Sequence, residues 1–114
     1  MLSIIPILVF LGTAYGGYVL SIQIKKEANI TSPILDFHRY SALAGIIILA
    51  LIIGFTEVTK LVIAALIIIS GAFIGGFFLF RLVFKNQTPP MLVVYGHAGF
   101  AIMGIVILMV TVLI

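Results

Sequence analysis

Residues 61–84 read LVIAALIIISGAFIGGFFLFRLVF, an apolar run that contains a single charged side chain, Arg81. About 20 residues of this kind, coiled as an α-helix, cross the hydrocarbon core of a bilayer, which is ~30 Å thick. The run does not alternate between apolar and polar residues, and this excludes a strand of a transmembrane β-barrel. We therefore expect a membrane-spanning α-helix in this stretch.

Three further apolar runs of similar length accompany this one. Among the 114 residues, 64% are hydrophobic and 8% are charged, whereas a soluble domain has ~25% charged residues. The sequence therefore predicts an all-α membrane protein, a four-transmembrane-helix bundle surrounded by lipid, and we expect no soluble catalytic domain within residues 1–114. The predicted spans cover about residues 2–24, 35–55, 61–84 and 91–114.

The few charged residues predict how the chain is oriented. The net charge is +3, but the basic residues gather near two loops, so we expect no nucleic-acid partner. By the positive-inside rule, loops 25–34 and 85–90 face the cytoplasm. The protein is then a multi-pass protein of the cell membrane with both termini outside. The basic residues near these loops are Lys25, Lys26, Arg39, Arg81 and Lys85, against Lys60 beside Glu57 at the opposite turn.

The chain also matches itself at an offset of 59 residues. Residues 1–55 align with residues 60–114 without a gap, and the only two histidines, His38 and His97, become partners. Two spans per repeat make both copies enter the membrane in the same direction, which indicates a pseudo-twofold axis along the membrane normal. We expect two tandem helical-hairpin repeats, with the histidines facing each other at one depth. Further identical pairs are Gly12 and Gly71, Gly16 and Gly75, Gly17 and Gly76, Ala42 and Ala101, and Gly45 and Gly104.

The paired histidines predict a cofactor. A histidine inside a membrane is a candidate functional residue. Two imidazoles do not complete a structural zinc site, which needs four ligands, but they suffice as the two axial ligands of a haem. The chain has no cysteine, which excludes disulfides, iron–sulfur clusters and covalent c-type attachment. We therefore predict one haem b per chain, with His38 and His97 as the metal ligands.

Other residues at matched positions are candidates for the walls of this cofactor site. A porphyrin is much wider than a side chain, so the helices beside it need small residues. Tyr18 and Phe77 are expected to pack on the ring, and Arg39 and Arg81 to bind the propionates. The small residues expected to make room are Gly12, Gly16, Gly17, Ala42, Gly45, Gly71, Gly75, Gly76, Ala101 and Gly104.

The pattern His38-xxx-Ala42-xx-Gly45 and its repetition from His97 to Gly104 resemble the small four-helix b-type membrane cytochromes, the broad class that includes cytochrome b561-like electron carriers. Many members of that class use four histidines for two haems, whereas this chain has two. The resemblance implies a non-catalytic electron carrier, or a subunit of an oxidoreductase complex. Its implied partners are quinol or quinone and other membrane redox subunits, or a second copy of the chain.

Two other interpretations stay open at this point. Chlorophyll could be bound through the same histidines. Alternatively, Gly12-xxx-Gly16 and Gly71-xxx-Gly75 are small-xxx-small motifs, which explain close helix packing without any cofactor. The chain would then be a small transporter or an assembly subunit, and its purified form would be colourless.

Overall fold

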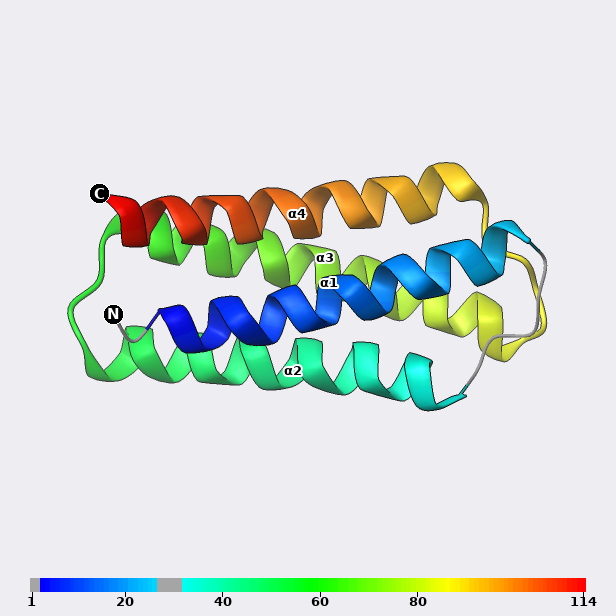
Figure 1. The fold of residues 1–114 in the computed structure, drawn as a ribbon, viewed down its shortest axis with the longest axis horizontal. Coiled ribbons are helices and arrows are strands. Elements are labelled where there is room, and N and C mark those ends of the chain that lie inside the picture. The colour runs from blue at the N-terminus through cyan, green and yellow to red at the C-terminus, as the bar shows by residue number, and fades with distance from the viewer. Residues whose placement is uncertain (1–2, 27–31) are drawn as a thin grey trace.

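A computed structural model describes residues 3–26 and 32–114 of the chain. Four α-helices run side by side in one bundle that measures 44 × 24 × 20 Å (Figure 1). All four are long and apolar enough to cross a membrane, so the predicted four-helix, all-α architecture is confirmed. The helices are α1 (Ile4–Lys25), α2 (Ser32–Phe55), α3 (Lys60–Phe84) and α4 (Met91–Leu113).

The ends of these helices lie within three residues of the predicted spans wherever the structure describes them. The largest difference is at α2, which begins at Ser32 rather than at residue 35. Pro33 does not prevent this, because a proline is tolerated in the first turn, where its missing N–H has no partner to lose. Residues 1–2 of the first predicted span and residues 27–31 of the loop 25–34 lie outside the described residues.

Backbone hydrogen bonds around Asn86 end helix α3. Asn86 adopts a left-handed conformation, with φ of 58°. Its N–H donates to the carbonyl of Val83, and the N–H of Gln87 donates to the carbonyl of Leu82. This pair of bonds is a Schellman motif, which ends a helix at a residue that tolerates positive φ. Asparagine is such a residue, so α3 ends where the polar loop begins.

The helices form two hairpins, α1–α2 and α3–α4. Packing is most extensive within each hairpin, and the hairpins meet through α1 against α4 and α2 against α3. Among the described residues, α2 and α4 have no close backbone contact and therefore lie on a diagonal. The start of α1 and the end of α4 lie at one end of the bundle, here called the terminal end (Figure 1). The loops after α1 and α3 lie at the other, here called the loop end.

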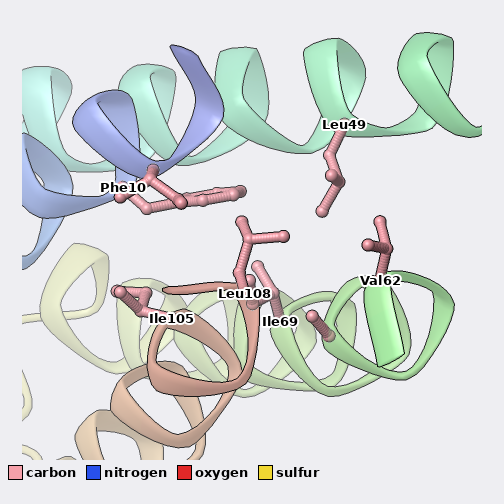
Figure 2. Close-up of a cluster of buried hydrophobic side chains, with 8 residues drawn as sticks. Phe10, Leu49, Val62, Ile69, Ile105 and Leu108 are labelled. Atoms are coloured by element: carbon pink, nitrogen blue, oxygen red, sulfur yellow. The ribbon is translucent and has the colours of Figure 1, made fainter. Parts of the chain in front are cut away.

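A cluster of buried apolar side chains (Figure 2) fills the interior of the terminal half of the bundle. Leu49 and Leu108 meet there and are fully buried. The helices come close because two glycines lack side chains: a Cβ on Gly45 would clash with the ring of Phe10. A Cβ on Gly104 would clash with Ile69 in the same way. The hairpins are thus packed together in this half, and the loop half contains the two histidines.

Candidate functional site

The two histidines meet between the hairpins. His38 is the seventh residue of α2 and His97 the seventh of α4, which puts each about 9 Å into its helix at ~1.5 Å per residue. Their ring centroids are 6.1 Å apart and the ring planes are inclined at 81°. Because α2 and α4 lie on the diagonal, the two side chains reach toward each other across the interior. The structure thus brings together the two residues that the sequence paired.

Each imidazole is fixed by one hydrogen bond to the backbone of the neighbouring helix. Nδ1 of His38 is 2.8 Å from the carbonyl oxygen of Thr13 on α1, and Nδ1 of His97 is 2.8 Å from that of Ala72 on α3. A carbonyl oxygen can only accept, so Nδ1 carries the proton in both rings. In the neutral ring, Nε2 is then left with a free lone pair. The arrangement presents two unprotonated nitrogens, which are available as ligands.

Two glycines make room for these rings. An α-helical carbonyl points toward the residue four positions later, so an imidazole that binds the carbonyl of residue 13 lies over residue 17. A Cβ on Gly17 would lie 2.9 Å from Cε1 of His38. A Cβ on Gly76 would lie 2.8 Å from Cε1 of His97. These distances are shorter than a real Cβ contact, so any side chain at either position would displace the ring.

Protein side chains also occupy the space beside other glycines that were expected to admit a porphyrin. Phe37 covers two of them: a Cβ on Gly12 would lie 3.5 Å from its ring, and a Cβ on Gly16 would lie 3.2 Å from it. In the core, Gly45 and Gly104 are covered by Phe10 and Ile69, as described above. These four glycines contact side chains of the chain itself, and their role in admitting a porphyrin stays a prediction.

Gly71 and Gly75, in contrast, border a groove. A Cβ on Gly71 would meet nothing within 4 Å, and one on Gly75 would only reach Nδ1 of His97 at 4.0 Å. The groove has a volume of about 400 Å³ and lies between α3 and α4. It is here called the glycine groove. Its floor and walls include Gly71, Gly75, Phe78, Gly96, His97 and Phe100.

A polar cluster beside His38 was not anticipated from the sequence. Oγ1 of Thr13 and Oγ of Ser41 are 2.6 Å apart. The hydroxyl of Thr13 is 3.0 Å from the carbonyl of Val9, and the hydroxyl of Ser41 donates to the carbonyl of His38. The contact between the two hydroxyls joins α1 to α2 next to the imidazole. The matching positions at the offset of 59 are Ala72 and Phe100, so the repeat gave no signal for this cluster.

Arg39 lies near the histidines but is engaged with protein groups. Its guanidinium forms an ion pair with Asp36, with 2.6 Å between Nη2 and Oδ1 and a second bond from Nε at 3.0 Å. The same group lies 4.7 Å from the ring centre of Phe80 on α3 and 4.6 Å from that of Tyr40. Arg39 therefore links α2 to α3 at the loop half. Its partner Asp36 lies one turn earlier on α2.

The remaining predicted site residues are exposed or half-buried. Tyr18 and Phe77 are 64% and 61% exposed, and Arg81 is exposed on the last turns of α3. Ala42 and Ala101 are half-buried, one turn after the respective histidine. Packing of Tyr18 and Phe77 on a ring, and binding of propionates by the two arginines, stay predictions.

The two imidazoles alone are too few to bind a bare metal ion, but they could complete the coordination of a metal that another molecule already binds. Among the described residues, no three histidine, cysteine or carboxylate side chains gather in a way that could hold a bare metal ion. Two imidazoles alone can complete the coordination of a metal that a macrocycle already holds. Comparison with models of known protein families, with curated proteins and with solved structures finds no match for this chain.

Proposed function

We propose that this chain is a membrane electron-transfer protein that binds one haem b between His38 and His97. The separation of the two rings carries the proposal. A metal held at ~2.0–2.1 Å by one nitrogen of each imidazole, on opposite sides, would set the ring centroids about 6.4 Å apart. The observed separation is 6.1 Å. The donor set and its spacing therefore fit the axial ligation of one tetrapyrrole metal.

The chain's own groups prepare the imidazoles for this role. The hydrogen bonds from Nδ1 to the carbonyls of Thr13 and Ala72 select the tautomer with a free Nε2 and increase the basicity of that nitrogen. Gly17 and Gly76 let both rings lie against the neighbouring helices. When bound, the haem iron supplies a one-electron couple. Because the chain has no cysteine, the haem is held without thioether bonds.

The contacts at the site support the proposed tandem repeat. His38 and His97 each bond to a carbonyl that lies 25 residues earlier in the chain. Each ring lies on a glycine, Gly17 or Gly76, and these two positions are again related by the offset of 59. Duplication of one hairpin would account for this correspondence, in which each imidazole has the same backbone hydrogen bond and the same glycine contact.

The depth of the histidines supports a role within a larger electron-transfer system. They lie near the loop end, so one haem there does not by itself span a hydrocarbon core that is ~30 Å thick. We propose that quinol or a partner protein exchanges electrons with this site, in a complex with other membrane subunits or a second copy. The basic residues near the loop end favour its placement in the cytoplasm, with both termini outside.

A haem assay and a visible spectrum test the proposal. We expect the protein, purified from membranes supplied with haem, to give one haem b per chain by the pyridine haemochrome method. Its reduced-minus-oxidised spectrum should be that of a low-spin cytochrome b. A protein without a Soret band, or with two haems per chain, would contradict the proposal. A chlorophyll spectrum would show that chlorophyll, and not haem, is the bound tetrapyrrole.

A cofactor-free role as a small transporter or an assembly subunit is the second candidate. The edge-to-face arrangement of the two imidazoles, at 6.1 Å and 81°, favours it, because aromatic rings attract each other in this geometry without any metal between them. Under this alternative, the histidines only join the hairpins. A colourless protein that keeps its fold would support it.

A further inference from the structure

The glycine groove exists because the two hairpins differ at one position. In the first hairpin, the ring of Phe37 lies over Gly12 and Gly16. The residue 59 positions after Phe37 is Gly96, which has no ring to place over the corresponding glycines. A hollow of about 400 Å³ remains there. The first hairpin thus demonstrates that a six-membered aromatic ring suits this surface of paired helices.

The walls of the groove differ between the hairpins in a complementary way. Phe78 and Phe100 border the groove on α3 and α4, and the residues 59 positions earlier are Val19 and Ser41. The second hairpin, which has Gly96 where the first has Phe37, therefore has phenylalanine at two positions where the first does not. Flat conjugated rings gain stacking and edge-to-face contacts between such walls, whereas a saturated lipid chain gains only apolar contact.

The groove also opens toward the lipid and reaches the histidine pair. Ile74 at its border is 72% exposed, and both wall phenylalanines are more than half exposed. His97 forms part of the lining. A volume of about 400 Å³ lies within the range of small-molecule sites, roughly 300–1,000 Å³. A molecule dissolved in the bilayer could enter sideways and come into contact with one of the two proposed haem ligands.

We propose that the glycine groove binds a lipid-soluble quinone, whose flat ring lies on the glycines between Phe78 and Phe100. This inference rests on the proposed electron-transfer function, since it supplies that function with its redox partner. The ring takes the place that Phe37 fills in the first hairpin, and the isoprenoid tail extends into the lipid. Quinone binding then brings a redox-active ring next to His97.

Direct binding of decylubiquinone tests this inference. The protein is placed in phosphatidylcholine nanodiscs, and quinone bound at equilibrium is measured against empty nanodiscs, with haem-loaded and haem-free protein in parallel. We expect one saturable site per chain in both preparations. Gly96→Phe, which supplies the missing ring from within the chain, should weaken binding at least tenfold. Phe100→Leu, which keeps the wall apolar but not aromatic, should weaken it several-fold.

Gly99→Phe is the matched control. It makes the same change on the same helix, at an exposed glycine whose Cβ would meet nothing within 4 Å and which does not line the groove. It should bind quinone as the unsubstituted protein does. Helix content and size-exclusion profile, measured for every variant, identify loss of fold. Equal binding by Gly96→Phe and Gly99→Phe, or no saturable binding by the folded protein, would overturn the inference.

Two further outcomes separate this inference from its rivals. An unsubstituted protein that dimerises, becomes monomeric on Gly96→Phe and shows no saturable quinone binding would assign the groove to contact between copies of the chain. Quinone binding that Phe100→Leu leaves unchanged would show that an apolar tail, and not the quinone ring, lies in the groove. Either result overturns the quinone proposal. Quinone binding by a protein that never takes up haem overturns only the proposed function, and haem uptake without quinone binding overturns only this inference.

Discussion

Gly76→Ala is the substitution that tests the histidine site most directly. The added methyl group would lie 2.8 Å from Cε1 of His97 and 3.4 Å from Nδ1 and Nε2. The hydrogen bond from Nδ1 to the carbonyl of Ala72, at 2.8 Å, holds the ring against this same helix. The ring cannot move away from the methyl group without lengthening this bond. We therefore expect the imidazole of His97 to be displaced from the position in which it would bind the haem iron, although His97 itself is not substituted.

The expected loss follows from two contributions. Overpacking a closely filled site costs about 1–3 kcal/mol. Loss of the Nδ1 hydrogen bond costs about 0.5–1.5 kcal/mol more. If the two together lower haem binding by ~3 kcal/mol, the affinity falls by roughly 100-fold, since about 1.4 kcal/mol corresponds to a factor of ten. Gly17→Ala, with its methyl group 2.9 Å from Cε1 of His38, should have a similar effect.

The assay is titration of the haem-free protein in detergent with haemin, followed by the Soret band and by the low-spin visible bands. Gly71→Ala is the control, because it makes the same change on the same helix, where the methyl group meets nothing within 4 Å. We expect its haem affinity to stay within twofold of the unsubstituted protein. Thermal unfolding of the haem-free variants shows whether Gly76→Ala disturbs the bundle itself.

Two results for Gly76→Ala would contradict the proposed position of His97 as a ligand. If Gly76→Ala and Gly71→Ala bind haem with the same affinity and the same low-spin spectrum, His97 does not ligate from the position described here. If Gly76→Ala unfolds at a much lower temperature even without haem, the glycine serves helix packing, as the small-xxx-small interpretation holds.

Three further predictions concern the ligands, the orientation and the core. His38→Ala and His97→Ala should lose the low-spin spectrum to a similar extent because each removes one of two required ligands, and a normal low-spin spectrum in either variant would contradict two-ligand binding. A reporter fused after Ile114 should be active only on the outer side of the membrane, as the basic loops require, and activity only in the cytoplasm would reverse the orientation. Leu108→Ala should lower the free energy of unfolding by about 2–5 kcal/mol, because it empties a fully buried site. Denaturation in mixed micelles measures this loss, and an equal loss for Met109→Ala, at a 40% exposed neighbour, would contradict the core described here.

Several features could be predicted from the sequence because they depend on single segments. Each span is long because a hydrocarbon layer must be crossed, and each loop is short and polar because it meets water, so hydropathy alone located the four helices to within three residues wherever they are described. The pairing of His38 with His97 was also accessible, since equal offsets in two hairpins of the same direction place residues at equal depth.

The contacts of each helix face, in contrast, were decided by the tertiary structure. Lipid and protein core are both apolar, so the sequence pattern does not indicate which side of a membrane helix faces inward. The glycines at 17 and 76 receive imidazoles, those at 12 and 16 receive Phe37, and Gly71 stays open, although the sequence predicted one role for all five, that of making room for a cofactor. Their roles depend on the rotation of each helix about its axis and on the side chain that its neighbour presents. Those quantities are set by the packing of all four helices at once, and no single segment contains them.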